Sequence, residues 1–453
     1  MVGYMTNTIS HIVKRDGTIV EFDPKKISIA IHKAAGAVGI HDKPLCDQLT
    51  KDVVCLLEQD SARGEKNITV ERIQDIVEET LIRNKYASIA KAYILYRDYR
   101  ARLRQGRSDK IQTQEVIPYK KIWEVLSWNC DHECETVEKL NAHIRNGSIQ
   151  SLIAEAEKAY HADVEKAAQA ILERKEQIRV VIIAGPSSSG KTTTTIKLAE
   201  FLSKQGFKLL ALNIDNYFFN LECHPKDEFG DYDFETPEAL DLKLINEHLG
   251  SLMEYKPVQV PRYDFKTGKR LAESDLFSID KGQIILIDTL HGLYEPMTQS
   301  VPAENKFRLY IEPLCQLKDK NKEFVRWTDV RLLRRMTRDE RQRAYNPKMT
   351  IEHWHYVRRS ELKHIIPYIP TVDYIVNGSL CYELPVFKKY MFHHFPEFIK
   401  MYENNPAKQD AYKRAKRIFE LLDSLETIDD KELVPGNSVL REFIGGSSYT
   451  YHV

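Results

Sequence analysis

The sequence predicts an α/β fold in which a parallel β-sheet has helices on both of its faces. From about residue 177 onward, short apolar runs alternate with helix-compatible runs, as in chains whose strands are joined by helical crossovers. A glycine-rich loop follows the first of these apolar runs. The five expected strands are Arg179–Ala184, Lys208–Ile214, Gln283–Ile287, Phe307–Ile311 and Val372–Val376. Helices are expected after Lys191, Thr236, Thr350 and Pro406.

Two other parts precede this α/β part. Residues 1–105 are expected to form a β-hairpin that turns at Asp16–Gly17, followed by a small helix bundle. The first helix of the bundle is expected after Asp23, a capping residue, with Pro24 at a position where its missing N–H costs nothing. Residues 106–176 are charge-rich and are expected to form a helical connector. The sequence thus predicts three parts: 1–105, 106–176 and 177–453.

The composition excludes several classes of protein. The chain has 66 Lys and Arg and 66 Asp and Glu, so its net charge is zero, which argues against a nucleic-acid-binding protein. No apolar run approaches the roughly 20 residues of a membrane helix, and the first 15 residues lack the apolar core of a secretory signal. Seven cysteines are few and odd in number, which favours reduced thiols. We therefore expect a cytoplasmic protein with no membrane and no nucleic-acid partner.

One short cluster raises the question of a structural metal. Cys130 and Cys134 flank His132. A structural zinc site needs four ligands, and no second pair lies nearby in the sequence, so ordinary thiols are the favoured interpretation.

The most specific motif is the loop between the first expected strand and its helix. It matches G-x-x-x-x-G-K-[ST], and such a loop binds phosphates through its backbone N–H groups and the helix N-terminus. Lys191 is expected to reach the β- and γ-phosphates and Thr192 to ligate Mg²⁺. The alternative is a Gly/Ser turn that binds nothing. The expected nucleotide-binding residues are Gly185, Pro186, Ser187, Ser188, Ser189, Gly190, Lys191, Thr192 and Thr193.

Two carboxylates follow expected strands. Asp215 ends the strand after the loop, where it could accept a proton from an attacking hydroxyl; a turn-forming Asp is the alternative. Asp288 follows four apolar residues, which is the Walker-B arrangement of an acid that holds Mg²⁺; a simple strand end is the alternative. Thr192 and Asp288 are therefore the expected metal ligands.

A stripe of arginines is expected on one helix face, because they recur at helical spacing. We favour a phosphate clamp over a solvated face paired with Asp329, Asp339 and Glu340, and over a nucleic-acid contact, because guanidinium groups suit phosphates and a phosphate loop lies in the same part. The stripe consists of Arg331, Arg334, Arg335, Arg338 and Arg341.

At these residues the chain resembles the uridine kinase/phosphoribulokinase family of P-loop kinases, over roughly residues 177–400. The motifs GPSSSGKTT, IDNYF, YDFETPEALD, VQVPRYDF, IILIDTLHGL and DVRLLRRMTRD occur in the family's order. The resemblance implies a P-loop kinase sheet and transfer of the γ-phosphoryl group of ATP, with Mg²⁺, to the 5′-hydroxyl of a ribonucleoside. We also expect the protein to form a homo-oligomer.

The resemblance also implies roles for single residues. Asp215 corresponds to the carboxylate that deprotonates the 5′-hydroxyl, and Glu235 takes the place of an Asp that binds ribose hydroxyls. Tyr263 corresponds to a residue of the base pocket, and Tyr217 lies one position before a family tyrosine. Arg334 and Arg338 correspond to lid and substrate-proximal arginines. The implied catalytic residues are Lys191, Asp215, Arg334 and Arg338, and the implied substrate-binding residues are Tyr217, Glu235, Tyr263 and Arg334.

The chain departs from the family pattern at two places. The strand-end acid is usually Glu followed by Gly, whereas here it is Asp288 followed by Thr289. The base-reading His of the family's uridine and cytidine kinases is replaced by Gly268. A sugar phosphate or another small hydroxyl compound is therefore the alternative acceptor.

Residues 10–104 resemble an ATP-cone, a regulatory nucleotide-binding domain of ribonucleotide reductases and their repressors. VKRDG, FDPKKI, VERIQDIVEETL and AKAYILYRDYR carry this resemblance. It implies that Lys14, Arg15 and Lys26 contact the phosphates of ATP or dATP, which would act as an effector. The alternative is a purely structural hairpin domain.

Two other classes of function, a GTPase-type switch and a transcriptional regulator, fit the sequence less well. A GTPase-type switch needs N-K-x-D and D-x-x-G motifs, and neither occurs at the required place. A nucleotide-responsive transcriptional regulator needs a DNA-binding module, but the chain is neutral and lacks a Cys₄ pattern. A kinase with a nucleotide-sensing domain is therefore the favoured function.

Overall fold

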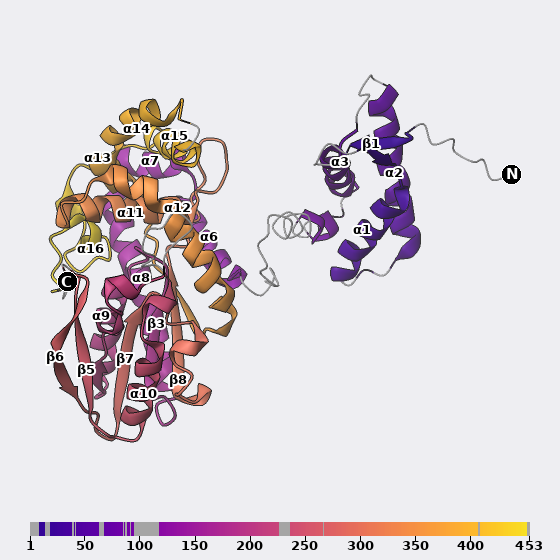
Figure 1. Ribbon diagram of the computed structural model, residues 1–453. Coiled ribbons are helices and arrows are strands. Elements are labelled where there is room, and N and C mark those ends of the chain that lie inside the picture. Colours follow the sequence, from indigo (N-terminus) through magenta and orange to yellow (C-terminus); the bar gives the residue numbers. More distant parts are fainter. Residues whose placement is uncertain are drawn as a thin grey trace. The chain divides into compact units, whose positions relative to one another are not determined.

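The structure is a computed structural model with two compact units, residues 1–113 and 114–453 (Figure 1). It describes residues 9–13, 19–38, 40, 42–62, 68–84, 86, 88–90, 92–94, 117–225, 236–265, 267–405 and 408–450. Among these residues, no helix is both long and apolar enough to cross a membrane.

The N-terminal unit is a hairpin on a small helix bundle, as predicted. Strands β1 (His11–Val13) and β2 (Ile19–Glu21) pair antiparallel. Helix α1 (Pro24–Ala37) is capped by Asp23, whose carboxylate accepts a hydrogen bond of 3.0 Å from the N–H of Lys25. Helices α2 (Lys43–Ala62) and α3 (Val70–Arg83) complete a core of its own, separate from that of the larger unit.

The larger unit is built on a parallel five-stranded sheet, which confirms the predicted fold class. The strands are β3 (Val180–Ala184), β4 (Lys208–Ala211), β7 (Gln283–Thr289), β8 (Lys306–Glu312) and β9 (Tyr374–Asn377). Their order is β4-β7-β3-β8-β9, so the strand that precedes the phosphate loop is central. The residues of β3 alternate between two buried cores: Val181 and Ile183 face one, and Val180 and Ile182 the other. Helices therefore cover both faces of the sheet.

The expected connector is part of this unit. Its helices are α6 (Tyr119–Asp131), α7 (Val137–Arg145) and α8 (Ile149–Leu172). Helix α8 packs against β9 and against α9 (Lys191–Lys204), the helix after the phosphate loop. Because the apolar face of α8 shares a core with β3, residues 117–172 belong to the larger unit and do not form a separate third part.

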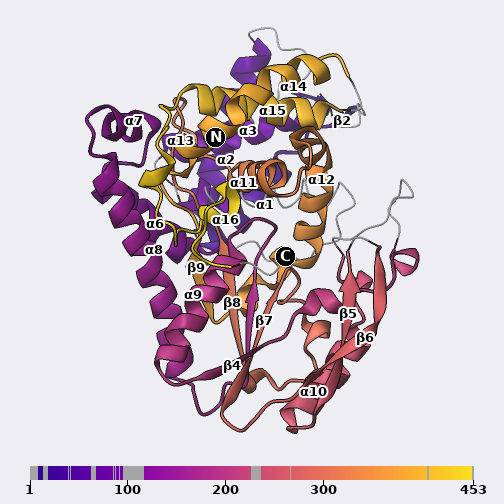
Figure 2. The ribbon, with the colours of Figure 1, turned by 90° about the vertical axis from the view of Figure 1, so that its left-hand side faces the viewer.

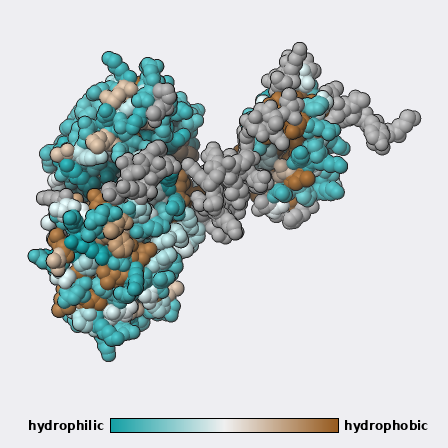
Figure 3. Space-filling model, in the orientation of Figure 1, coloured by the Kyte–Doolittle hydropathy of each residue, from teal (hydrophilic) through white to brown (hydrophobic). Residues whose placement is uncertain are grey.

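One sheet element was not predicted. Strands β5 (Val258–Asp264) and β6 (Lys269–Phe277) form an antiparallel hairpin beside the main sheet. Figure 3 shows apolar side chains on the face where Figure 1 places this hairpin. The exposed large apolar residues of the hairpin are Phe265, Leu271 and Leu276. The expected helix at Thr236 is only a short 3₁₀ turn, Pro237–Ala239, and α10 (Leu242–Met253) begins after the cap Asp241.

The remaining helices lie mainly beyond the carboxyl ends of the strands (Figure 2). They are α11 (Trp327–Gln342), α12 (Pro347–His364), α13 (Glu383–Met391), α14 (Phe395–Tyr402), α15 (Gln409–Asp423) and α16 (Arg441–Ile444). Short 3₁₀ turns are η1 (Ile214–Tyr217), η2 (Leu221–Cys223), η4 (Glu295–Met297), η5 (Ala303–Asn305), η6 (Ile366–Thr371), η7 (Phe392–His394) and η9 (Lys431–Leu433).

Candidate active site

The phosphate loop joins β3 to α9 and is tightly packed. A Cβ at Gly185 would lie 2.3 Å from the carbonyl oxygen of Ile311, so only glycine fits there. Gly190 has a φ of +95°, and a Cβ there would lie 2.5 Å from Val439. Gly190 therefore allows both the left-handed backbone and the close contact at the start of α9.

Lys191 folds back over this loop. Its Nζ donates hydrogen bonds of 2.9 Å to the carbonyl of Gly185 and 3.3 Å to that of Pro186. Burial lowers the pKa of the Lys191 ammonium, while the negative charge of Asp288 opposes that shift. The ammonium group therefore lies at the loop whose N–H groups and helix N-terminus favour anions.

The buried polar atoms of the loop fit an anionic ligand. Among the described residues, Ser189 Oγ and Arg338 Nε are buried and have no hydrogen-bond partner. Buried donors of this kind are normally satisfied, so a bound group with several acceptor oxygens would complete the site. Thr192 supplies a hydroxyl and Asp288 a carboxylate, oxygen donors of the type that Mg²⁺ prefers.

The two predicted carboxylates lie at the same edge of the sheet. Asp288 is at the end of β7 and is in register with Ile183 of β3. Burial raises the pKa of Asp288 to about 6; the charges of Glu442 and Asp215 add to this rise and Lys191 opposes it. A cation beside Asp288 would favour its ionised form.

Asp215 lies in the 3₁₀ turn η1, because β4 ends earlier than predicted, at Ala211. Asn213 holds this turn by accepting a hydrogen bond of 3.0 Å from the N–H of Asp215. Asp215 is exposed, yet limited hydration of its carboxylate raises its pKa, and the charge of Lys191 opposes that rise. Asp215 is thus an accessible base that lies close enough to Lys191 for the lysine charge to affect its pKa.

The arginine stripe on α11 faces the phosphate loop. Arg335 donates a hydrogen bond of 2.9 Å to Ser187 Oγ, and Arg338 donates one of 3.3 Å to Ser188 Oγ. Burial lowers the pKa of Arg338 to about 10, still well above neutral pH, so its guanidinium stays charged. These two arginines bring positive charge to the loop, which fits the predicted phosphate clamp.

The other two arginines that face the loop, Arg334 and Arg331, are buried beneath it. Arg334 is fully buried and donates hydrogen bonds of 2.7 Å to Glu383, 3.0 Å to the carbonyl of Ser189 and 2.6 Å to that of Gly378. Arg331 is likewise buried, pairs with Glu361 and bonds the carbonyl of Ser187. Arg334 therefore supports the loop from beneath, and its burial does not fit the expected role as a lid or substrate-binding arginine.

Tyr217 was wrongly predicted to bind substrate. Its side chain is fully buried, and its hydroxyl lies 2.9 Å from Nδ1 of His248. The aromatic ring belongs to the core between α10 and the sheet. Its backbone carbonyl is held as well, by a hydrogen bond of 2.7 Å from Arg270.

Tyr263 instead belongs to an aromatic group beside η1. Its ring centroid lies 5.6 Å from that of Phe218 and 5.0 Å from that of Phe265. Among the described residues, its buried hydroxyl has no hydrogen-bond partner. The backbone N–H of Tyr263 donates to Asn216, the neighbour of Asp215. Aromatic faces and an unpaired hydroxyl beside the candidate base suit a flat, polar acceptor group.

A pair of matched substitutions tests these two tyrosines. We expect Tyr263→Phe to raise KM for the acceptor several-fold, because a buried hydroxyl that pairs only with the ligand contributes about 0.5–1.5 kcal/mol. Tyr217→Phe should leave that KM within about twofold and lower only stability, since it loses one core hydrogen bond. Steady-state kinetics and thermal unfolding measure both; a larger KM change in Tyr217→Phe than in Tyr263→Phe would contradict the assignment.

Several predicted residues lie outside the described part of the chain. These are Glu235 in the larger unit and Lys14 and Arg15 in the N-terminal unit. The third predicted cone residue, Lys26, is exposed in the first turn of α1. That position is beside helix N–H groups with no intrahelical partner.

Sequence reasoning missed one part of the site, the segment 434–450. Glu442, in α16 of this segment, accepts hydrogen bonds from the N–H and the hydroxyl of Thr193 at 3.2 and 2.8 Å. It also pairs with Arg338 at 3.3 Å. The segment carries no recognised phosphate or metal motif, so only its position in space links it to the loop.

The suspected metal cluster is not assembled. Cys130 is exposed, Cys134 is buried, and His132 stacks on Trp128 with ring centroids 3.9 Å apart. In the described ranges, these three side chains do not form a group with metal-binding geometry.

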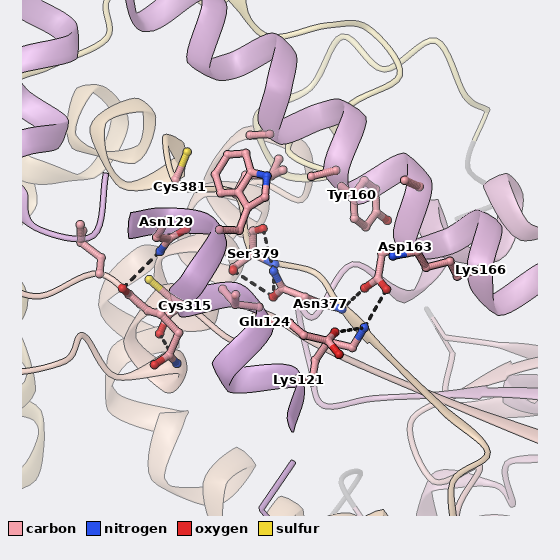
Figure 4. A pocket seen from close by; sticks show the side chains of 18 residues that line it. Lys121, Glu124, Asn129, Tyr160, Asp163, Lys166, Cys315, Asn377, Ser379 and Cys381 are labelled. Carbon is pink, nitrogen blue, oxygen red and sulfur yellow. Dashed lines mark hydrogen bonds and ion pairs between the residues drawn. The ribbon is translucent and has the colours of Figure 1, made fainter. Parts of the chain in front are cut away.

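A separate cavity of about 310 Å³ lies between α6, α8 and the segments after β8 and β9 (Figure 4). Asp163 at its edge accepts hydrogen bonds from Lys121 Nζ at 2.8 Å and from the N–H of Asn377 at 2.9 Å. None of its lining residues belongs to the phosphate loop, and neither Asp215 nor Asp288 lines it. The cavity is therefore distinct from the candidate active site.

Taken by themselves, the fold and site define a protein of the P-loop class: a central parallel strand, a phosphate loop, a helix, and acids at or shortly after the ends of neighbouring strands. Residues 180–383 match the phosphoribulokinase/uridine kinase family, and residues 10–102 match the ATP cone domain. The chain thus carries an ATP-cone domain followed by a kinase domain of the phosphoribulokinase/uridine kinase family.

Individual relatives match each part separately. A uridine kinase of Deinococcus deserti is 27% identical over 198 residues, which are 44% of this chain and 86% of that protein. The α subunit of ribonucleoside-diphosphate reductase of Chlamydia trachomatis is 36% identical over 140 residues, 29% of this chain but only 13% of that protein. A solved structure described as a possible uridine kinase from Bacillus stearothermophilus has 19% identity and a TM-score of 0.28, covering 33% of this chain and 79% of that one. That structural similarity is too low to support a conclusion.

Proposed function

We propose that the larger unit transfers the γ-phosphoryl group of ATP to the 5′-hydroxyl of a nucleoside. The observation that carries the proposal is the position of Asp215: its accessible carboxylate senses the charge of Lys191 and lies in the same turn as Asn216, which holds the backbone of Tyr263. A base and a phosphate-binding cation are parts that such a transfer requires. The aromatic side chains around Tyr263 suit the flat base of a nucleoside.

In the proposed reaction, the loop N–H groups and Lys191 hold the β- and γ-phosphates. Asp215 accepts the proton of the acceptor hydroxyl while the acceptor oxygen bonds to the γ-phosphorus and the bond to the β-phosphate oxygen breaks, so that ADP leaves. Arg335 and Arg338 neutralise charge on the transferred group, and Arg334 keeps the loop in place from below. Thr192 and Asp288 would hold Mg²⁺, which when bound would supply further charge neutralisation on the phosphates.

One observation favours a second acceptor class, a sugar phosphate or another small hydroxyl compound. Gly268, where related nucleoside kinases have a base-reading His, has a φ of +67°. A Cβ there would lie 3.0 Å from Leu221, and its carbonyl accepts a hydrogen bond of 2.8 Å from the N–H of that residue. A histidine does not fit this backbone without a shift, so the base is not read in that way here.

A substrate screen tests the proposal directly. The full chain is incubated with Mg-ATP and a panel of ribonucleosides, deoxynucleosides, sugars and sugar phosphates, and ADP formation is measured. We expect turnover with at least one nucleoside, and none in a Lys191→Ala control. Turnover confined to sugar phosphates would establish the second class, and no turnover with any compound would overturn the kinase assignment.

We further propose that ATP or dATP bound to the N-terminal unit regulates the kinase. The exposed Lys26 at the start of α1 and the hairpin that precedes it fit an anion site. An effector changes a distant site only through different affinities for two states, typically about 1–3 kcal/mol of coupling. ATP or dATP should therefore change activity several-fold, and inhibition by a deoxynucleotide is the more natural sign.

Calorimetry on the Lys191→Ala protein separates the two nucleotide sites. We expect this variant to retain one site for ATP or dATP. Adding Lys14→Ala or Lys26→Ala should weaken binding at that site about tenfold or less, as expected for the loss of one charge. Lys51→Ala, an exposed lysine on α2, is the matched control and should bind normally. Complete loss of nucleotide binding in Lys191→Ala alone would make the N-terminal unit a structural appendage.

A further inference from the structure

The segment 434–450 lies directly on the phosphate loop. The side chain of Val439 packs against Gly190, close enough that no Cβ would fit between them. The segment is anchored by α11: Gln342 donates hydrogen bonds of 2.9 Å and 3.1 Å to the carbonyls of Glu442 and Phe443, and Arg341 one of 3.1 Å to that of Ile444. Figure 2 shows α16 close to α11 above the sheet.

Within this segment, the Glu442 carboxylate takes the position expected of a phosphate. One of its oxygens, Oε2, accepts from the N–H and the hydroxyl of Thr193, in the first turn of α9. The other, Oε1, faces the guanidinium of Arg338 at 3.3 Å. A helix N-terminus and an arginine around two anionic oxygens is the arrangement that binds phosphate groups.

The position of Glu442 also has an electrostatic consequence. Its negative charge adds to those of Asp288 and Asp215 around Lys191. A triphosphate brings more negative charge to the same place, and like charges at close range disfavour each other strongly in a partly buried site. Glu442 and the nucleotide therefore compete for the amide of Thr193 and for Arg338.

We propose that the segment 434–450 is a built-in competitor of the nucleotide, in which the Glu442 carboxylate fills a phosphate position of the loop until ATP displaces it. The proposal rests on the proposed function, in that the loop must bind a nucleotide. If the Glu442 carboxylate occupies the phosphate position in about nine-tenths of the protein molecules, only the other tenth can bind nucleotide. The apparent Kd for nucleotide then rises about tenfold.

Nucleotide titration of the full-length protein tests this proposal. Binding of Mg-ATP is measured by calorimetry in the wild type, in Glu442→Gln and in Glu432→Gln. Each measurement is repeated with Lys191→Ala added, and the binding that this substitution abolishes is assigned to the phosphate loop. We expect Glu442→Gln to lower the Kd for Mg-ATP at the phosphate loop about tenfold. Glu432→Gln, an exposed glutamate shortly before the segment, should leave that Kd unchanged.

Hydrogen exchange of the unmodified protein gives a second readout that needs no variant at Glu442. Saturating Mg-ATP should increase amide exchange in residues 438–446, and this increase should be absent in Lys191→Ala. Unchanged or weaker binding in Glu442→Gln, or protection of residues 438–446 by Mg-ATP, would overturn the proposal and make the segment a wall of the site. Absence of any Lys191-dependent nucleotide binding would overturn the proposed function together with it.

Discussion

Replacing Lys191 by alanine should lower kcat by about 10² or more, whichever acceptor the kinase uses. The ammonium lies over the phosphate loop, bonded to the carbonyls of Gly185 and Pro186. In the proposed function it holds the β- and γ-phosphates. Loss of one preorganised electrostatic group of this kind costs about 10²–10³ in rate. Initial-rate measurements of ADP formation at saturating acceptor determine the effect.

Lys204→Ala is the matched control for this substitution. Lys204 lies in the last turn of the same helix, α9, and is exposed. Its replacement should leave kcat within about twofold of the wild type, since surface substitutions away from the site have small effects. If Lys191→Ala kept a near-normal kcat, the loop would not hold the reacting phosphates.

The second large effect is expected from Asp215→Asn. The amide has nearly the size of the carboxylate but cannot accept the proton of the acceptor hydroxyl, so nucleotide binding should persist while kcat falls by about 10²–10⁴. Because limited hydration raises the pKa of the Asp215 carboxylate, wild-type kcat/KM should fall as the pH drops through that pKa and the base becomes protonated. The residual rate of the variant should lack this part of the pH dependence.

Asp280→Asn serves as the control for the base. Asp280 is an exposed carboxylate at the other end of β7, just before the strand begins. Its replacement should change neither kcat nor the pH profile. A near-normal kcat in Asp215→Asn would move the base elsewhere, with Asp288 as the next residue to test.

Local chemistry made much of the fold and the position of the candidate site predictable. The apolar runs of β3, β4, β7, β8 and β9 lie where expected, and the loop between β3 and α9 was predicted from the spacing of eight consecutive residues, Gly185 to Thr192. Asp23 caps α1 as predicted, because capping depends only on residues within one helical turn.

The helical spacing of the arginine stripe on α11 was also visible in the sequence, but its division into two roles was not. Arg334 is buried because Glu383, 49 positions later in the chain, neutralises it. Arg338 remains at the loop, paired with Glu442, 104 positions later. An arginine can bind a ligand only if no acidic side chain from elsewhere in the fold has buried and paired its guanidinium group. The spacing of the arginines along the sequence does not show which acid lies beside each one.

The sequence by itself therefore determined the elements whose cause is local: the parallel strands, the glycine-rich loop and the cap of α1 at Asp23. Only the tertiary structure decided that Tyr217 is a core residue bonded to His248, that α8 shares the core of the sheet, and that Glu442 lies at the start of α9. These features arise because burial and ion pairing join residues that are far apart along the chain. Such contacts contribute free energy only after folding has brought the residues together, so local sequence patterns do not reveal them.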